Sequence, residues 1–417
     1  MSGGTGLLLL LVAAAASAAA GVPLFAVLAG AGVAAMVITG TDLAVAAVEV
    51  HRLASTPTLV ALPLFVLAGV VLSQGRSPRR FKLLLRAAFS WLPGGEAVGI
   101  VLAATLFTAF SGASGLTLVA LGGLFLHQRP SDPRLQKRRI GAITAAGTPG
   151  LLLPPSLPVI VYAITAGVPV DQLYRATLVP AVVLVTLLAS YAALRSPTPR
   201  APFRWRRLLV ALRMNAWELP LPLLVTGGLF SGVVALSEVA VVMAGYTLLA
   251  ALLRGELKLG WASRVLSEAA TMSAVILAVV AAAFILSNVL VDQQVPQSIV
   301  AAIARDLGGP VAFLLLLNVT LLVAGMFFDI FSATVVLVPL VAPAAARLGI
   351  DPLHLGTIFL LNLEVGYLTP PVGINLFVAK LRFGQPIAQV YRAALPYLGI
   401  MLLVLAAVTY LPELAVR

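Results

Sequence analysis

The sequence predicts an all-α membrane protein that crosses the bilayer many times, and three observations carry this prediction. First, 61% of its 417 residues are hydrophobic and only 10% are charged, whereas a soluble domain carries about 25% charged residues. Second, the basic residues lie in clusters separated by long apolar stretches. Third, interruptions rich in proline, glycine and serine recur in both halves at one spacing. Together these features predict an inverted repeat with two re-entrant helical hairpins and two broken helices.

The positions of the charges predict how the chain lies in the membrane. The net charge is +12, from 27 Lys and Arg against 15 Asp and Glu. Short loops rich in Lys and Arg stay cytoplasmic, so the five basic clusters are assigned to that face. The clusters are Arg76, Arg79, Arg80, Lys82 and Arg86; Arg129, Arg134, Lys137, Arg138 and Arg139; Arg195, Arg200, Arg204, Arg206, Arg207 and Arg213; Arg254, Lys258 and Arg264; and Lys380, Arg382 and Arg392. The opposite face is left with Arg52, Arg175, Arg305, Arg347 and Arg417.

Two segments of the first half do not fit simple spanning helices. The apolar stretch at about 95–127 begins and ends near cytoplasmic clusters and is interrupted by small residues at 111–115. Each arm has about 15 residues, fewer than the ~20 that span a bilayer, so a re-entrant hairpin is expected. The stretch at about 140–170 leads away from a basic cluster, yet Gly147 to Gly150 and Pro154-Pro155 interrupt it. A broken spanning helix is therefore expected there.

The second half repeats these features. Pro370-Pro371 follows Pro154-Pro155 by 216 residues, and Asp329 follows the break at Ser111 by 218. The predicted organisation is a first repeat at 1–194, a basic cytoplasmic connector at 195–216 and a second repeat at 217–417. The second repeat contains a hairpin at about 309–347 and a broken helix at about 355–381. The charge map gives the two repeats opposite orientations, which is a signature of transporters.

Two further segments complete the predicted topology. The N-terminal apolar run at 6–40 is expected to form two short helices that turn near Gly21, with a cleaved signal peptide as the competing interpretation. Residues 82–91 are amphipathic and are expected to lie along the membrane interface as a connecting arm.

The interruptions are also the candidate binding sites, because unwound backbone at membrane depth persists where it is buried or lines a polar cavity. Carbonyl and hydroxyl oxygens there suit a hard monovalent cation such as Na⁺. The first candidate Na⁺ site comprises Ser111, Gly112, Ser114, Gly147, Thr148 and Gly150. The second comprises Asp329, Ser332, Thr334, Gly366, Thr369 and Gly373. Between them, the candidate substrate-binding residues are Pro154, Pro155, Ser156, Pro370, Pro371 and Asn375.

Plainer structural interpretations stand beside these. A single Pro-Pro break is more often a structural kink, although the duplication favours a site. Asp329 fits a helix-capping role as well as an ion-ligand role. Asn362 and Glu364 precede the second break and fit a capping role there.

Three stretches carry a resemblance to a known family, and they are 62–69, 147–156 and 362–377. The last reads Asn-Leu-Glu-Val-Gly-Tyr-Leu-Thr-Pro-Pro-Val-Gly-Ile-Asn-Leu-Phe and is highly specific. Over essentially its whole length the sequence resembles the large membrane subunit of tripartite ATP-independent periplasmic (TRAP) transporters. This resemblance implies a multi-pass protein of the bacterial inner membrane, an elevator-type architecture and Na⁺-coupled import of a small organic acid, such as a C4-dicarboxylate or a sialic-acid-like compound. It also implies two partners, a small four-helix membrane subunit and a periplasmic substrate-binding protein.

Two departures from the family pattern touch the first ion site. The family usually has leucine where Pro149 stands, and its first hairpin tip is often richer in serine than residues 111–115 are here. The binding residues therefore carry over as regions, and the individual ligands named above rest on their chemistry.

Rival functions remain at this stage. A Na⁺- or H⁺-coupled dicarboxylate symporter or antiporter that needs no binding protein would share these features. An intramembrane enzyme could use Asp329 and Glu364 as an acid pair, but no second catalytic motif accompanies them. The chain has no cysteine, no phosphate loop and only three scattered histidines, so no cofactor besides Na⁺ is expected. The expected surroundings are lipid, and no nucleic acid partner is expected.

Overall fold

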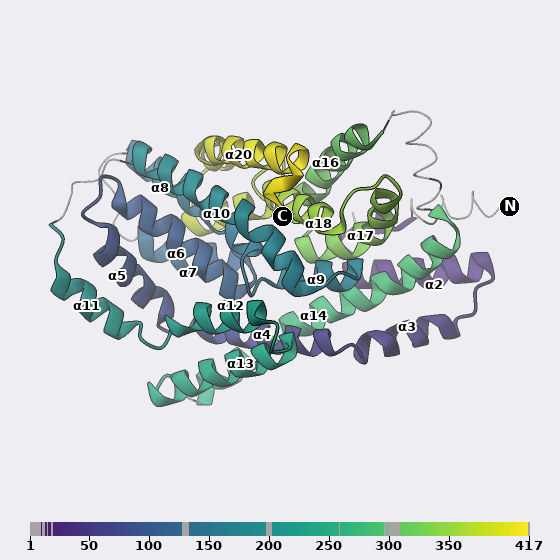
Figure 1. The fold of residues 1–417 in the computed structure, drawn as a ribbon, viewed down its shortest axis with the longest axis horizontal. Helices are drawn as coiled ribbons and strands as arrows, with labels where there is room; N and C mark the ends of the chain where they lie inside the picture. Colours follow the sequence, from purple (N-terminus) through teal and green to yellow (C-terminus); the bar gives the residue numbers. More distant parts are fainter. Residues whose placement is uncertain are drawn as a thin grey trace.

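A computed structural model describes residues 20–126, 133–196, 202–257, 259–295 and 309–415, together with the isolated positions 10, 13, 14, 16, 17 and 298. Within these residues the chain is helical and contains no strand (Figure 1). The first half and the connector contain α2 (Leu24–Thr39), α3 (Ala44–Ala54), α4 (Pro57–Gln74), α5 (Ser77–Phe89), α6 (Gly95–Ser111), α7 (Ser114–Leu126), α8 (Pro133–Ala146), the 3-10 helix η1 (Thr148–Leu152), α9 (Leu157–Ala166), α10 (Val170–Arg195) and α11 (Trp205–Met214). The second half contains α12 (Pro220–Ser231), α13 (Leu236–Leu253), α14 (Leu259–Asp292), α16 (Pro310–Phe327), α17 (Ile330–Arg347), α18 (Pro352–Gly366), α19 (Ile374–Phe383), α20 (Ile387–Tyr410) and the 3-10 helix η2 (Pro412–Leu414).

Six of the described helices are long and apolar enough to cross a membrane, and the number rises to 8 if each of two bent pairs counts as one span. The chain is therefore an all-helical multi-span membrane protein, as predicted. One bent pair joins α8 and η1 to α9 at an angle of 42°, where the sequence predicts a broken helix. The other pair, α3 with α4, was not predicted. By length and composition alone α16 and α17 could each cross the membrane, whereas α6 and α7 have 17 and 13 residues.

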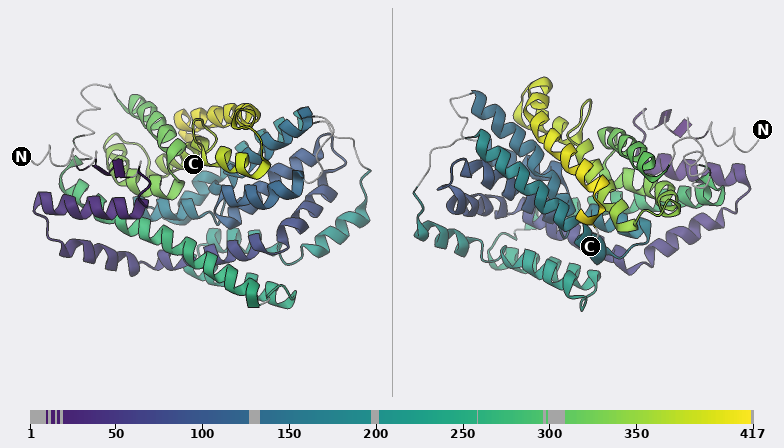
Figure 2. Two further views of the ribbon diagram at one scale, coloured as in Figure 1. Left: turned by 180° about the vertical axis from the view of Figure 1, so that it is seen from behind. Right: turned by 45° about the horizontal axis from the view of Figure 1, so that its top comes forward.

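The helices of the two halves pack against each other reciprocally. Helix α2 packs along α14, and α13 packs along α4. The second arm of each candidate hairpin contacts the half-helix after the break in the other half: α7 contacts α19, and α17 contacts α9. Likewise α8 packs on α20, and α18 packs on α10. Figure 2 shows α8 and α20 side by side. Each of these contacts between the halves therefore has a counterpart, in which the equivalent helices of the two halves have changed places.

Helix α18 lies at the centre of the molecule. Every residue from His354 to Gly366 is buried, which is unusual for a helix that carries Asn362 and Glu364. Its Phe359 ring packs against the buried Tyr162 of α9, and the two ring centroids lie 5.3 Å apart. The core therefore surrounds the helix that leads into the second break.

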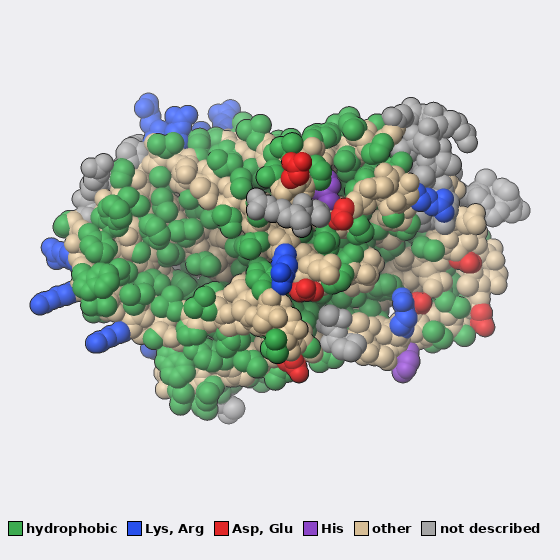
Figure 3. Space-filling model, viewed as in Figure 1, with side chains coloured by type: hydrophobic (Ala, Val, Ile, Leu, Met, Phe, Trp, Pro, Cys, Tyr) green, Lys and Arg blue, Asp and Glu red, His purple; other side chains and the backbone are tan. Residues whose placement is uncertain are grey.

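One end of the molecule is strongly basic. Figure 3 shows Lys and Arg side chains at the end of the molecule where α8 and α11 lie. The connector contributes α11 to this end, where no helix was predicted. Most of the amphipathic arm predicted at 82–91 belongs to α5, which begins at Ser77 and ends at Phe89.

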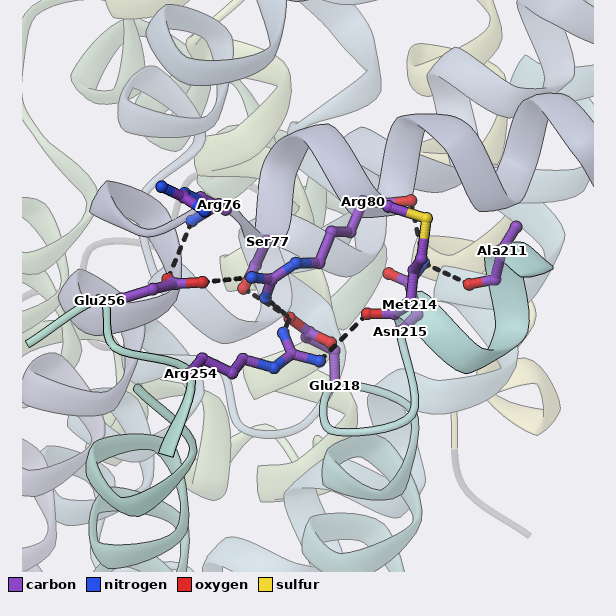
Figure 4. Close-up of polar contacts among 9 residues, drawn as sticks. All are labelled: Arg76, Ser77, Arg80, Ala211, Met214, Asn215, Glu218, Arg254 and Glu256. Atoms are coloured by element: carbon purple, nitrogen blue, oxygen red, sulfur yellow. Dashed lines mark hydrogen bonds and ion pairs between the residues drawn. The ribbon is translucent and has the colours of Figure 1, made fainter. Parts of the chain in front are cut away.

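A buried cluster of charges joins the start of α5 to the second half (Figure 4). The Glu218 carboxylate accepts hydrogen bonds from Ser77 Oγ at 3.0 Å, Arg80 at 2.8 Å and Arg254 at 2.7 Å. Arg80 also pairs with Glu256, which accepts a hydrogen bond from the backbone N–H of Arg76. A buried carboxylate needs such partners to offset the loss of hydration. The cluster therefore fixes α5 to the segments that enter α12 and α14.

Candidate functional site

The first hairpin tip is lined by hydroxyl groups. Helices α6 and α7 are joined by a turn at Gly112, which has φ 67°. Thr108 Oγ1 donates to Thr117 Oγ1 at 2.8 Å, and Ser111 Oγ lies 3.2 Å from the same oxygen. Thr105 Oγ1 donates to the carbonyl of Ala146 at 3.0 Å, just before the first break. These side chains are buried, so the tip presents oxygen atoms inside the protein.

Two glycines allow α6 to lie directly against the first break. A Cβ atom on Gly150 would lie 2.3 Å from the carbonyl oxygen of Thr105. A Cβ atom on Gly147 would lie 3.1 Å from Thr108 Oγ1 and 3.2 Å from Ser114 Cβ. Real Cβ atoms do not approach backbone as closely as the first distance requires. Glycine is therefore needed at 150 for the tip and the break to meet.

The predicted first ion site is assembled only in part. Ser111, Ser114 and Gly147 lie at the junction between the hairpin tip and the break. The Thr148 hydroxyl points elsewhere, because it donates to the Ala145 carbonyl at 2.8 Å and lies 3.6 Å from Met401 Sδ on α20. Gly112 forms the turn itself, and a Cβ atom there would collide with Leu157 at the start of α9.

The carbonyls of the first break already accept hydrogen bonds. The Leu151 carbonyl accepts from the Ser156 hydroxyl, and the Leu152 carbonyl accepts from Thr177 Oγ1 at 2.8 Å. The Ser156 carbonyl accepts from the Tyr174 hydroxyl at 2.8 Å. The predicted substrate residues Pro154, Pro155 and Ser156 are all buried. The peptide bond Pro154-Pro155 is cis, as is Pro370-Pro371 in the second break.

In the second hairpin, Asp329 caps α17. Its Oδ1 accepts from the backbone N–H groups of Phe331 and Ser332, each at 3.0 Å, and its Oδ2 accepts from the Ser332 hydroxyl. The side chain is half-buried. Thr334 Oγ1 donates back to the Ile330 carbonyl at 2.5 Å. The carboxylate therefore has a structural role as a helix cap, and a cap can also present its remaining lone pairs to a cation.

The second hairpin tip also meets the second break closely. Gly325 and Gly366 bring α16 and α18 together, since a Cβ atom on Gly366 would lie 2.6 Å from the backbone of Gly325. The Ile330 backbone N–H donates to the Tyr367 hydroxyl at 2.6 Å. The N–H of Gly373 donates to the Met326 carbonyl at 3.1 Å. The predicted second-site residues Asp329, Gly366 and Gly373 therefore belong to one junction.

The remaining residues predicted around the second break differ in exposure. Thr369 is half-buried, and its hydroxyl donates back to the Val365 carbonyl at 2.8 Å. Pro370 and Pro371 are exposed. The Pro371 carbonyl accepts a hydrogen bond from the Tyr391 hydroxyl. The Pro-Pro pair of the second break is therefore exposed, whereas that of the first break is buried. We call the second break open and the first sealed.

One hydrogen bond connects the two repeats at their candidate sites. Ser114 Oγ, at the first hairpin tip, donates to Asn375 Oδ1, in the first turn of α19, at 3.0 Å. Asn375 is fully buried, and its Nδ2 has no hydrogen-bond partner. The same tip touches Leu157 at the start of α9 through Gly112. The N-terminal ends of both half-helices therefore meet at the tip of the first hairpin.

Two buried polar residues of α18 lie just before this region. Asn362 Nδ2 donates to the Asn318 carbonyl at 3.0 Å and to Asn318 Oδ1 at 2.7 Å. Glu364 is fully buried, and neither carboxylate oxygen has a hydrogen-bond partner. The Glu364 carboxylate therefore does not cap the second break; Asn362 bonds to α16 instead.

Several residues at these junctions were not predicted from the sequence. Thr105 and Thr108 precede the predicted residue Ser111 at intervals of three on α6, a spacing that places the three hydroxyls on one helix face and could have identified both threonines. Tyr174 and Tyr391 are 217 residues apart, close to the repeat offset, and each donates its hydroxyl to a carbonyl of its own repeat's break. No spacing or repeat offset in the sequence pointed to Thr117.

An all-helical, multi-span fold in which polar groups converge at interrupted helices is typical of secondary transporters. Comparison with known proteins agrees with this class. The sequence profile of the tripartite ATP-independent periplasmic transporter, DctM component, matches residues 11–414. The chain therefore belongs to the family of TRAP transporter large permease components, which are transporters and not enzymes, and it is a multi-pass protein of the bacterial inner membrane.

Individual relatives cover most of the chain. The C4-dicarboxylate TRAP transporter large permease protein DctM of Pseudomonas aeruginosa is 36% identical over 375 residues, which is 88% of each chain. The ectoine/5-hydroxyectoine TRAP transporter large permease protein UehC of Ruegeria pomeroyi is 29% identical over 86% of this chain and 85% of its own. The isethionate TRAP transporter permease protein DctMQ of Oleidesulfovibrio alaskensis is 32% identical over 85% of this chain and 57% of its own.

Among solved structures, the YdaH transporter of Alcanivorax borkumensis has a similar fold. The TM-score is 0.58, the sequence identity is 17%, and 84% of each chain is covered. The intramembrane-enzyme alternative is removed by the family assignment.

Proposed function

We propose that this chain imports a small organic acid across the inner membrane, driven by Na⁺, after a periplasmic binding protein has delivered the solute. A small membrane subunit is the expected second partner. The names of the relatives support this proposal, since they are permease proteins of TRAP transporters for C4-dicarboxylates, isethionate and ectoine. The first two solutes are carboxylate or sulfonate anions, so a small anion is the favoured substrate class.

The junction between Ser114 and Asn375 is the observation that carries the proposal. The Asn375 Nδ2 group is a buried donor without a partner, and such a group costs free energy unless a ligand satisfies it. The N-terminal ends of α9 and α19 add the positive ends of two helix dipoles. These features suit the carboxylate of a substrate that enters between the first hairpin tip and the second break.

Two oxygen-rich junctions beside this position are the proposed Na⁺ sites. The first uses the hydroxyls of Ser111 and Ser114 with backbone carbonyls near Gly147, and the buried Thr108 and Thr117 extend it. The second uses Asp329 with backbone carbonyls near Gly366. Hydroxyl, carbonyl and carboxylate oxygens match a hard cation. Bound Na⁺ would also balance the negative charge of the substrate.

We further propose that the two hairpins and broken helices move together past a fixed scaffold, as in an elevator. The reciprocal packing of the two halves supports an inverted repeat, because a two-fold relation exchanges each helix pair with its counterpart. The Glu218 cluster supports a fixed scaffold, because it ties the start of α5 to the segments entering α12 and α14.

The proposal is tested in proteoliposomes that contain this chain with its small subunit. Uptake of labelled succinate, isethionate and ectoine is measured with an inward Na⁺ gradient or an equal K⁺ gradient, with and without the cognate binding protein. Na⁺-dependent uptake of one solute that needs the binding protein is the expected result. Uptake without the binding protein would favour the independent symporter, and equal uptake in K⁺ would refute Na⁺ coupling.

A further inference from the structure

A large cavity opens at the basic end of the molecule, away from the helix breaks. It has a volume of about 910 Å³ and is lined mainly by residues of α5, α8 and α11. Five arginines line it: Arg86 from α5, Arg139 from α8, and Arg204, Arg206 and Arg207 at the start of α11. The positive-inside rule places this end in the cytoplasm.

The charges in this cavity are unbalanced. Its one acidic lining residue, Glu96, pairs with Arg139 at 2.6 Å. Among the described residues, Arg86, Arg204, Arg206 and Arg207 have no acidic partner within ion-pair distance. Burial lowers the pKa of the nearby Lys82 ammonium, and Arg86 and Arg139 lower it further, against the opposing effect of Glu96. An anion in the cavity would relieve this repulsion.

The same cavity has an apolar side that a purely ionic ligand would leave uncovered. Leu83 of α5 and Val210 of α11 both line it and are 48% and 58% exposed. Both helices are strongly amphipathic, so their apolar faces need covering. The cavity therefore combines cationic and hydrophobic surfaces in one place.

Three exposed aromatic rings beside the cavity indicate its level in the membrane. The rings of Trp91, after α5, and Phe203, before α11, meet edge to face at 6.4 Å. Phe203 also lies 6.4 Å from Trp205 in the first turn of α11. All three rings are exposed. Exposed tryptophans beside arginines are typical of the level of the lipid headgroups.

We propose that this cavity binds one anionic phospholipid of the cytoplasmic leaflet. Arg86, Arg206 and Arg207 hold the phosphate and the anionic headgroup, and the acyl chains lie against Leu83 and Val210. Arginine suits a phosphate because its planar fork donates two parallel hydrogen bonds. The lipid would link α5 and α11 to the cytoplasmic end of the first hairpin, where Glu96 and Arg139 meet. This site is separate from the proposed transport function.

The test is lipid binding by the purified full-length chain in a neutral detergent. Native mass spectrometry measures the apparent Kd for dioleoyl phosphatidylglycerol and for dioleoyl phosphatidylcholine, and thermal unfolding is followed in parallel. The triple variant Arg86→Gln, Arg206→Gln, Arg207→Gln removes the proposed phosphate ligands. At ~1 kcal/mol for each arginine near an anionic lipid, it should weaken phosphatidylglycerol binding roughly a hundredfold.

Three controls make the outcome decisive. Arg79→Gln with Arg213→Gln removes exposed charge from the same two helices outside the cavity and should leave the Kd within about twofold. A triple Arg→Lys variant keeps the charge but loses the planar fork, so its Kd should lie between those of the unmodified chain and the glutamine variant, and it keeps the test valid if the glutamine variant folds poorly. Glycerol 3-phosphate and inorganic phosphate should neither compete nor stabilise. The proposal is overturned if the glutamine triple variant binds phosphatidylglycerol as the unmodified chain does, if the control pair weakens binding equally, or if free phosphate competes.

Discussion

The two helix breaks have similar sequences but different surroundings. The first, from Gly147 to Ser156, is buried almost throughout, and helices α6 and α10 cover it. Its carbonyls accept hydrogen bonds from Tyr174, Thr177 and Ser156. The second break exposes Pro370, Pro371 and Val372. One break is therefore a packed part of the core, and the other is open on one side.

This difference in burial predicts which break moves when ligands bind. Segments with few buried contacts open at low cost in free energy, whereas packed segments open only when much of the core does. The second break and its hairpin tip, where Phe327 and Phe328 are also exposed, are thus the part that we expect to rearrange when substrate and ions bind. The first hairpin tip and the first break should keep their arrangement when substrate and ions bind.

The largest expected effect comes from adding a methyl group at the packed junction. Gly150→Ala places Cβ 2.3 Å from a carbonyl oxygen of α6, with no room to shift, and should lower the free energy of unfolding by roughly 3 kcal/mol. Gly373→Ala, in the open break, introduces a side chain at φ 51° and places Cβ 2.8 Å from the carbonyl oxygen of Tyr367. This contact is less close than the one at Gly150, so the substitution should cost less, roughly 2 kcal/mol. The midpoint of thermal unfolding in detergent measures both.

Gly399→Ala is the control for these substitutions, because its Cβ would meet nothing within 4 Å in α20. It should be neutral or slightly stabilising. Equal losses of stability for Gly150→Ala and Gly373→Ala would contradict the contrast between a sealed and an open break.

The next effect concerns the contact between the repeats. Asn375→Ala removes the buried amide that faces the proposed substrate position and should reduce uptake in proteoliposomes by roughly tenfold or more, since a hydrogen bond to a charged group contributes ~1.5 to 3 kcal/mol. Ser114→Ala removes only the neighbouring donor and should have a smaller effect. Because the two side chains are bonded to each other, the double variant should be no worse than Asn375→Ala alone. Additive losses would show that they act independently.

A smaller effect separates the capping role of Asp329 from its charge. Asp329→Asn keeps a side-chain oxygen that can accept from the N–H groups of α17, so stability should change little. Asp329→Ala loses the cap and should cost ~1 kcal/mol. Asp351 caps α18 in the same way, through Leu353 and His354, and Asp351→Ala should cost a similar amount. A large loss of stability in Asp329→Asn would show that the charge itself holds the fold together.

The last comparison concerns the two tyrosines whose hydroxyls donate to carbonyls of the breaks. Tyr174→Phe leaves the buried Ser156 carbonyl without its donor and should cost about 1 to 3 kcal/mol. In Tyr391→Phe the Pro371 carbonyl lies at an exposed turn where water can replace the hydroxyl, so the cost should stay below ~1 kcal/mol. Thermal unfolding of both variants compares them directly, and the reverse order would argue against the sealed first break.

Much of the fold could be predicted from the sequence because its signals are local. Apolar length identifies spanning helices, and Pro154-Pro155 and Pro370-Pro371 mark the interruptions at the repeat offset. Most of the site could not be predicted this way, because it depends on side-chain direction. Thr148 and Ser114 stand at equally suggestive positions, yet one hydroxyl turns to Met401 and the other to Asn375.

Long-range pairing explains the other omissions. The bond between Ser114 and Asn375 joins residues 261 positions apart, and no periodicity within either repeat indicates it. The difference in exposure between the breaks arises from the helices packed around them, α6 and α10 in the first case. No helix was predicted in the connector, whose charges and prolines drew attention away from the amphipathic pattern of α11, which begins after the last of these prolines.

Calorimetric titration of the purified chain with NaCl, against KCl at equal ionic strength, tests most directly whether the junctions bind the coupling ion. We predict a saturable heat with Na⁺ alone. It should be reduced in Asp329→Ala, in which only the first site remains intact, and retained in full in Asp351→Ala, although both variants lose a helix cap. Equal heats for Na⁺ and K⁺, or a Na⁺ heat unchanged in Asp329→Ala, would contradict the account.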